Sequence, residues 1–383
     1  MSAPVPLLDL RRQFASIGAE VERALRSVLE SQRFILGKEV RALEKECAAF
    51  VGVGESIGVA SGTDALFLSY RALGLEPDDE VITTPFTFFA TASAILNAGA
   101  RLVLADIEER TFNLDPEAAG SAISPRTRAV CVVHLFGQAA SMEAFQRMSQ
   151  KTDLALVEDA CQSLGARAGG SMVGSLGRTG AFSFFPSKNL GGAGDGGLVT
   201  TGDTALAGRI RSLRHHGQTG PYEHAWIGTN SRLDEIQAAI LRVKLKSLEQ
   251  WNEARRRNAR ALNERFRASG LAVREDGGPL GGADLSLPVE APGRRHVYNQ
   301  YTLRARDRDG LVRHLKETGI GCAVYYPIPL HLQPCLAGLG YARGRFPRTE
   351  AASAEVVSLP VFPELKAEEI DRVAGAVRSY YKK

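Results

Sequence analysis

Long apolar stretches are missing from this sequence. No segment approaches the roughly 18 uncharged apolar residues that a membrane-spanning helix needs, and residues 1–14 lack the apolar core of a secretory signal. We therefore expect a cytoplasmic protein without a membrane partner. No internal repeat or low-complexity tract is evident either.

Cysteine is scarce, odd in number and widely scattered. The five cysteines show none of the paired spacings that hold zinc, so we expect reduced core thiols rather than disulfides or a metal site; they are Cys47, Cys131, Cys161, Cys322 and Cys335. His215 and His216 are adjacent, and neither is followed four residues later by a residue of metal-ligand type. The sequence therefore predicts no metal.

A strong charge of one sign is also lacking. The net charge is only +4, with 23% charged residues of both signs. The densest basic run, Arg255–Arg260, lies in a helical stretch with Glu253 and Glu264 nearby. We interpret this run as a solvated helix face rather than a nucleic-acid site.

What the sequence does contain is material for a large core. It has 383 residues, 44% of them hydrophobic, which predicts one large domain and a smaller one. Short apolar runs alternate with helical patterns through the first two thirds, as in strands joined by crossover helices and covered on both faces of a mostly parallel sheet. The clearest strand candidates are Val81–Thr84, Arg101–Ala105, Ala129–His134, Leu154–Glu158, Ala181–Phe185 and Gly197–Thr201.

The pattern changes at Ser231, where a long helical stretch begins. Two apolar stripes run along it, the first formed by Leu233, Ile236, Ile240 and Val243 and the second by Leu241, Leu245 and Leu248. Beyond it, a strand-like segment at residues 297–304 and a helix near 308–318 indicate a smaller α+β domain. We place the boundary near residue 250, giving domains 1–250 and 251–383.

Two strand ends carry chemically useful side chains. Lys188 follows the apolar strand 181–185 and precedes a glycine-rich turn, a position from which a side chain can reach a cleft. Alone it would more often be an ordinary surface lysine. Glu158 and Asp159 end another apolar strand, and because successive strand residues point to opposite faces, only one of them can easily face a given site. The alternative for such an acid is a helix cap.

Two glycine-containing segments invite a phosphate interpretation. Ser61-Gly62-Thr63 precedes an amphipathic helix, whose free N–H groups and dipole suit a phosphate, although a plain N-cap is equally compatible. Gly192-Ala-Gly194-Asp-Gly-Gly197 formally matches the dinucleotide pattern GxGxxG. That pattern should open a helix, whereas here a strand-like segment follows, so we interpret it as a turn.

Taken together, these segments resemble the DegT/DnrJ/EryC1/StrS family of sugar aminotransferases, which have the aspartate aminotransferase (type I) fold. The resemblance covers nearly the whole chain. It includes Asp9-Leu-Arg-Arg-Gln, Phe34-Ile-Leu-Gly37, Tyr326-Pro-Ile-Pro-Leu-His331 and Ser358-Leu-Pro-Val-Phe-Pro363. The order and spacing of so many motifs make chance agreement very unlikely. The resemblance implies an enzyme that uses pyridoxal 5'-phosphate (PLP), with pyridoxamine 5'-phosphate as its intermediate form.

The same resemblance assigns the cofactor residues. Lys188 becomes the Schiff-base lysine and Asp159 the partner of the pyridine nitrogen, which makes the protonated ring an electron sink. The other implied contacts are Gln162 to the ring hydroxyl, Phe88 stacked on the ring, Gly62, Thr63 and Ser183 on the phosphate, and Asn230 reaching the phosphate from the partner subunit. For Phe88, core packing is the plain alternative. A related branch of sugar dehydratases has histidine in place of the lysine, so Lys188 favours transamination.

The implied reaction moves an amino group from L-glutamate to a keto sugar carried by a nucleotide, in a homodimer with a composite active site. The motifs look most like members acting on 3-keto sugars, and a 4-keto sugar is the alternative. Candidate substrate contacts are Tyr326, His331 and Arg232, for which a surface salt bridge is equally plausible. An NAD-dependent sugar-nucleotide oxidoreductase and a non-catalytic PLP-binding regulator are the rivals from other classes.

Overall fold

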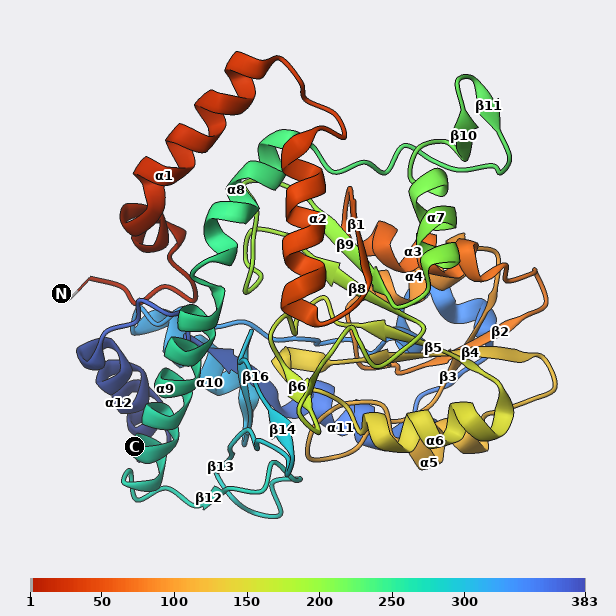
Figure 1. Ribbon diagram of the computed structural model, residues 1–383. Coiled ribbons are helices and arrows are strands. Elements are labelled where there is room, and N and C mark those ends of the chain that lie inside the picture. Colours follow the sequence, from red (N-terminus) through yellow and green to blue (C-terminus); the bar gives the residue numbers. More distant parts are fainter. Residues whose placement is uncertain (1–2, 383) are drawn as a thin grey trace.

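The computed structural model describes residues 3–382, and its centre is a seven-stranded sheet flanked by helices (Figure 1). The strand order is β1-β9-β8-β5-β4-β2-β3; β9 runs antiparallel to both of its neighbours, β1 and β8, and the remaining pairs are parallel. The expected mostly parallel sheet is confirmed. Its strands are β1 Glu55–Val59, β2 Glu80–Thr83, β3 Arg101–Leu104, β4 Thr127–Val133, β5 Ala155–Asp159, β8 Thr179–Ser183 and β9 Gly197–Thr201.

Both faces of this sheet are buried under helices. In β4, Ala129 and Cys131 pack on one side with helices α3, α4 and α7, while Val130 and Val132 pack on the other with α2, α5, α6 and α8. This explains why the strands are apolar without alternation. The helices are α2 Lys38–Val51, α3 Gly62–Leu73, α4 Phe89–Asn97, α5 Pro116–Ser121, α6 Met142–Thr152, α7 Thr204–Leu213 and α8 Glu235–Leu245.

The six clearest strand candidates are all present, and no end is shifted by more than two residues. Strand β1 was not predicted; it is a short edge strand that contains Gly58 and, among the described residues, pairs with β9 alone. The helix expected from Ser231 begins four residues later, at Glu235, because Asp234 is extended and the N–H of Glu235 donates a hydrogen bond to the carbonyl of Phe34. It also ends at Leu245, and α9 (Leu248–Arg267) follows as a separate helix.

A second core forms around a four-stranded sheet of β12 Val273–Arg274, β13 Leu285–Ser286, β15 Tyr301–Ala305 and β16 Val356–Leu359. The helices α9, α10 (Arg308–Glu317) and α12 (Ala367–Tyr381) supply its apolar side chains, together with Val5 near the amino end of the chain. The expected strand at 297–304 is shorter and begins at Tyr301. Outside these two cores lie α11 Pro347–Glu355 and a small sheet of β6 Arg167–Ala168, β7 Ser171–Met172 and β14 Arg294–Arg295.

Two elements project from the body in Figure 1, helix α1 (Leu10–Ser31) and the hairpin of β10 (Gln218–Gly220) and β11 (Glu223–His224). Helix α1 rests on α8, where Val21 packs with Ile240 and Val243. The two apolar stripes of α8 therefore pack against different elements. One contacts α1, and the other, through Leu241, packs in the core of the large sheet. Near the hairpin, Tyr222 is 96% exposed and Ile227 is 88% exposed.

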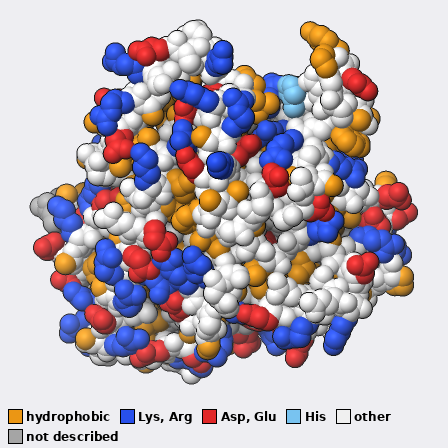
Figure 2. Space-filling model, viewed as in Figure 1, with side chains coloured by type: hydrophobic (Ala, Val, Ile, Leu, Met, Phe, Trp, Pro, Cys, Tyr) orange, Lys and Arg blue, Asp and Glu red, His pale blue; other side chains and the backbone are white. Residues whose placement is uncertain are grey.

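Charged side chains of both signs are interspersed over the face shown in Figure 2. One expectation about charge is wrong: Arg255, within the basic run of α9, is only 5% exposed, and burial lowers its pKa to about 10. Arg257 and Arg260 do face the solvent. Within residues 3–382, no helix is both long and apolar enough to cross a membrane.

Candidate active site

Polar side chains from several strand ends meet at one edge of the large sheet. The parallel strands β1, β2, β4, β5 and β8 all end there, and antiparallel β9 begins there. Ligands of open α/β sheets bind at this edge. A cavity of about 630 Å³ opens at this place, and eight of the eleven residues expected from the sequence line it: Gly62, Thr63, Phe88, Asp159, Gln162, Ser183, Lys188 and Tyr326.

The turn after β1 forms one end of the cavity. Ser61 caps α3 by accepting a hydrogen bond from the N–H of Asp64 at 3.0 Å, which leaves earlier N–H groups of the helix free. A Cβ on Gly62 would lie 2.7 Å from the Cβ of Ser183 and 2.8 Å from the Sγ of Cys161. Only glycine allows this close approach of turn and strand. The result is a helix N-terminus with hydroxyl groups beside it, which suits a phosphate.

The end of β5 divides its two acids between the faces of the sheet. Asp159 lines the cavity and is 6% exposed. Its Oδ2 accepts a hydrogen bond from the hydroxyl of Thr91 at 2.7 Å, and its Oδ1 accepts one from the N–H of Cys161 at 3.2 Å. Glu158 points away and is fully buried. Asp159 is thus the only acid of the pair that can serve a ligand in the cavity.

Lys188 lies in the loop after β8, on the wall of the same cavity. Burial lowers the pKa of Lys188, with Cys161 and Asp159 acting in the opposite direction. The loop is anchored from behind, since Asn189 donates a hydrogen bond to the Oδ1 of Asn252 at 2.5 Å. The following glycine run is a turn, as expected: β9 begins at Gly197, where a Cβ would lie 2.3 Å from the carbonyl oxygen of Ser61.

Aromatic and amide side chains complete the opposite wall. Phe88 is 58% exposed and its ring lies 6.3 Å from that of Tyr326, so it is not a core residue. Gln162 accepts a hydrogen bond from the N–H of Phe136 at 2.7 Å and donates one to the hydroxyl of Tyr326 at 3.0 Å. One N–H of the Gln162 amide therefore stays free for a ligand. Burial raises the pKa of Tyr326, which keeps its hydroxyl protonated.

These features fit PLP. The cavity offers an exposed aromatic face, a buried carboxylate with spare acceptor capacity, a lysine of lowered pKa, and a glycine turn at a helix N-terminus. Each corresponds to a different part of the cofactor: ring face, ring nitrogen, aldehyde and phosphate.

Three expected residues lie elsewhere in the structure. His331 is 2% exposed and pairs with Glu350 at 3.1 Å, packed against the ring of Phe346, so its position differs from the expected substrate contact. Arg232 donates a hydrogen bond to the Nδ1 of His215 at 2.9 Å rather than entering the cavity. Asn230 is exposed and forms a backbone bridge with His215.

Other residues that line the cavity were not predicted from the sequence, among them Thr87, Cys161, Ser187, Asp195, Gln300 and Tyr325. Thr87 and Cys161 stand within one residue of Phe88 and Gln162, so their place in the sequence was a usable signal. Asp195 is the one charged residue in the glycine run; its side chain is exposed, and no described residue forms a hydrogen bond or ion pair with it. Gln300 comes from the loop before β15 and carries no such signal.

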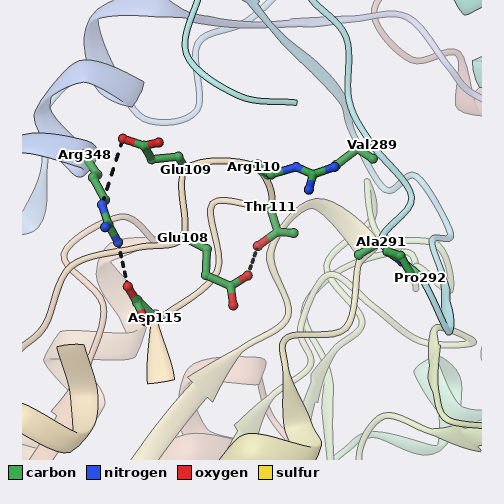
Figure 3. Close-up of a pocket in the computed structure, with 9 residues that line it drawn as sticks. All are labelled: Glu108, Glu109, Arg110, Thr111, Asp115, Val289, Ala291, Pro292 and Arg348. Atoms are coloured by element: carbon green, nitrogen blue, oxygen red, sulfur yellow. Dashed lines mark hydrogen bonds and ion pairs between the residues drawn. The ribbon is translucent and has the colours of Figure 1, made fainter. Parts of the chain in front are cut away.

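A second pocket, of about 370 Å³, lies on the surface and differs in its chemistry (Figure 3). Arg348 binds Asp115 at 2.6 Å, Glu108 accepts a hydrogen bond from the hydroxyl of Thr111 at 2.7 Å, and Arg110 donates one to the carbonyl of Asp276 at 2.7 Å. Across the described part of the chain, no group of three or more histidine, cysteine, aspartate or glutamate side chains is placed to hold a metal ion.

Comparisons with known proteins show which family this chain resembles. Residues 15–378 match the model of the DegT/DnrJ/EryC1/StrS aminotransferase family. The chain is 46% identical over 378 residues to the pleiotropic regulatory protein of Geobacillus stearothermophilus, covering 99% of each chain. It is 43% identical over 374 residues to UDP-N-acetyl-3-dehydro-alpha-D-glucosamine 3-aminotransferase of Acidithiobacillus ferrooxidans, covering 98% of this chain and 97% of that one. The crystal structure of Streptomyces venezuelae DesV in complex with a ketimine intermediate is 41% identical, covers 100% of both chains and superposes with a TM-score of 0.93.

Proposed function

The chain belongs to the DegT/DnrJ/EryC1/StrS aminotransferase family, whose members depend on PLP, and we propose that it transfers the amino group of L-glutamate to a 3-keto sugar carried by dTDP or UDP. The products would be 2-oxoglutarate and an amino-sugar nucleotide, formed in the cytoplasm. The observation that carries this proposal is the meeting of Lys188, Asp159 and Phe88 in one cavity at the sheet edge.

When bound, PLP supplies an electron sink for the bond that breaks at the α-carbon of the amino donor. Asp159 supports that chemistry as the acceptor for the ring nitrogen, and Phe88 supports one face of the ring. Gln162 offers its free N–H to the ring hydroxyl, and the phosphate is held by Gly62, Thr63 and Ser183. These are the residues that would bind and orient the cofactor.

Lys188 has the second task of moving a proton. Burial lowers the pKa of Lys188, which favours the neutral amine, and a lysine amine can both accept and return a proton. We assign to its Nζ the removal of a proton from the α-carbon of the amino donor. In the second half of the reaction, the same atom returns a proton to the sugar carbon that receives the nitrogen.

The choice of a 3-keto sugar is supported by the relative from Acidithiobacillus ferrooxidans, whose name specifies a 3-dehydro sugar and a 3-amino product. The test offers the purified protein L-glutamate with 3-keto or 4-keto sugars on dTDP or UDP, and follows amino-sugar nucleotides by mass spectrometry. We expect efficient amination of a 3-keto substrate. Amination of a 4-keto but not a 3-keto sugar would reverse the assigned position, and no amination of any of the four would contradict the proposed substrate class.

A regulator that binds the cofactor without catalysis is the second candidate function. It is favoured by the name of the Geobacillus stearothermophilus relative. Lys188 and Asp159 are also compatible with cofactor binding alone, so their place in the cavity does not separate the two functions. Reaction with L-glutamate alone separates the two functions, because only an aminotransferase releases 2-oxoglutarate.

The proposed enzyme is a homodimer in which Asn230 contacts the phosphate in the partner subunit. Ser231 donates a hydrogen bond to Asp64 at 2.9 Å, so this segment runs beside the cavity of its own chain, but Asn230 is exposed and does not line that cavity. The segment that carries Asn230 passes beside the cavity of its own chain, and Asn230 faces outward. In a two-fold symmetric dimer, such a segment can contact the cavity of the partner subunit.

Complementation tests this arrangement. Losing one hydrogen bond to the phosphate should weaken cofactor binding by about 1.5 to 3 kcal/mol in Asn230→Ala. Mixing Asn230→Ala with Lys188→Ala chains under exchange should restore one good site per heterodimer. If exchange is demonstrated and activity stays at the sum of the separate variants, Asn230 acts within its own chain.

A further inference from the structure

The carboxylate of Asp159 is held by a short line of buried hydroxyl groups. Thr91, in the first turn of α4, contacts its Oδ2 at 2.7 Å, and the hydroxyl of Thr87 lies 3.0 Å from that of Thr91. Thr91 is 0% exposed and Thr87 is 3% exposed, so bulk water has little access to these contacts. Neither residue has a role in the site as proposed above.

The donor and acceptor at each hydrogen bond of this line follow from the chemistry of the three side chains. An ionised carboxylate only accepts hydrogen bonds, so the single hydroxyl proton of Thr91 is committed to Asp159. At the contact between the two threonines, Thr91 can then only accept, and Thr87 must donate. The order is Thr87 to Thr91 to Asp159, with every proton assigned.

The line also connects two parts of the cofactor site. Thr87 directly precedes Phe88, whose exposed ring faces the cavity, while Asp159 ends β5. The N–H of Cys161 fixes the Oδ1 of Asp159 at 3.2 Å, and Thr91 fixes the Oδ2. Because both oxygens are hydrogen-bonded, the carboxylate is held in one orientation. That orientation depends, through Thr91 and Thr87, on the turn that carries Phe88.

We propose that Thr91, supported by Thr87, is a positioning residue that aims the carboxylate of Asp159 at the ring nitrogen of PLP and keeps it in register with Phe88. This rests on the proposed role of Asp159. The alternative is that Thr91 merely satisfies its own hydroxyl at a helix start and contributes only to folding.

A double-mutant cycle on cofactor affinity separates these possibilities. The full-length protein carries Thr91→Val, Asp159→Ala or both, and its dissociation constant for PLP is measured by absorbance titration. Loss of a hydrogen bond to a charged group predicts that Thr91→Val weakens binding by about tenfold to a hundredfold. In the Asp159→Ala background the same change should have almost no effect. Thr91→Ser, which keeps the hydroxyl, should recover most of the wild-type affinity.

Thr83→Val provides the matched control. Thr83 is also 0% exposed and donates to a backbone carbonyl, that of Cys131 at 3.0 Å, but it has no contact with Asp159. It should leave cofactor affinity unchanged even if it lowers the melting midpoint. The ¹⁵N signal of ring-labelled PLP, which reports protonation of the ring nitrogen, should shift in Thr91→Val and not in Thr83→Val.

Wild-type affinity in Thr91→Val, or an equal loss in both backgrounds, would overturn the inference, because Thr91 would then act independently of Asp159. If Thr91→Val fails to fold, the cycle is run with Thr87→Val, for which a smaller coupling of the same sign is expected and no coupling is contradictory. If Asp159→Ala alone changes neither affinity nor the ¹⁵N signal, the proposed role of Asp159 fails, and the inference fails with it.

Discussion

Glu158 and Asp159 are neighbours in the sequence, both acidic and both buried, yet they meet opposite surroundings. Glu158 is 0% exposed and accepts hydrogen bonds from the N–H groups of Gly174, Leu176 and Gly177 at 2.6 to 2.8 Å. It also faces the Nε2 of His134 at 2.9 Å; the Nδ1 of His134 accepts from the N–H of Ala140, so Nε2 is the donor. Asp159 accepts from two donors among the described residues and borders a cavity.

The difference teaches how to tell a structural acid from a functional one. Four donors occupy the acceptor positions of Glu158, so it has nothing left for a ligand and instead ties the loop after residue 172 to the sheet. Asp159 keeps unused acceptor capacity at the point where a cofactor nitrogen would lie. Because successive strand residues point to opposite faces of the sheet, two adjacent acids have these two different environments.

The largest expected effect comes from Lys188→Ala, which removes the amine proposed to bind PLP and to carry the proton. Turnover should fall by more than about 1,000-fold, because both the covalent anchor and the proton carrier are lost. The fold should remain intact by circular dichroism. Lys151→Ala, at an exposed lysine of α6, is the control and should behave as wild type. Substantial single-turnover transamination by Lys188→Ala without added amines would contradict the assignment.

Asp159→Asn should lose activity but little stability. The amide still accepts the hydrogen bond from Thr91, so PLP should bind, but the ring nitrogen loses its anionic partner and kcat should fall by about a hundredfold or more. Steady-state kinetics and the melting midpoint measure the two effects. A normal kcat would count against the electron-sink argument.

Glu158→Gln should lose stability but little activity. An amide group would place N–H groups against backbone donors inside a buried network, which should cost about 3 to 5 kcal/mol of unfolding free energy. Turnover per folded, cofactor-loaded protomer should stay near wild type. Urea unfolding and active-site titration provide both numbers. A large loss of kcat at unchanged stability would mean that Glu158 takes part in the reaction, and would contradict the distinction between Glu158 and Asp159.

A smaller effect should appear when Lys188 is replaced by methionine in the cofactor-free protein. Because burial lowers the pKa of Lys188 below 10.5, the unfolded chain binds more protons in the interval between the lowered value and 10.5. Burying the lysine therefore destabilises the wild type at neutral pH, and this cost disappears as the pH rises through that interval. Lys188→Met should be more stable than wild type at neutral pH, with the urea midpoints converging toward pH 10.5. A less stable variant would contradict the sign.

Much of this site was predictable from the sequence because its residues follow strand ends. Lys188, Asp159 and the Ser61 turn each adjoin an apolar run, and parallel strands bring such ends to one edge. The partners of these residues were not predictable in the same way. Thr91 lies in a helix, and its contact with a residue 68 positions away depends on how α4 packs.

The errors have similar causes. Arg255 resembled a surface residue because its neighbours are charged, but the packing of α9 buries it. The substrate role of His331 stays a prediction, since the short helix Leu330–Leu332 directs its side chain toward Glu350 and not into the cavity. The strand β1 was missed because five edge residues containing a glycine give a weak pattern.

The most direct test of the central claim mixes the PLP-loaded protein with L-glutamate in the absence of any sugar. If Lys188 and Asp159 support transamination, each loaded site should release one molecule of 2-oxoglutarate and then stop, and a keto-sugar nucleotide added afterwards should take up the stored amino group. Lys188→Ala is measured in parallel. Release of 2-oxoglutarate no greater than in Lys188→Ala, with the cofactor still bound, would contradict the account and favour a protein that binds PLP without using it.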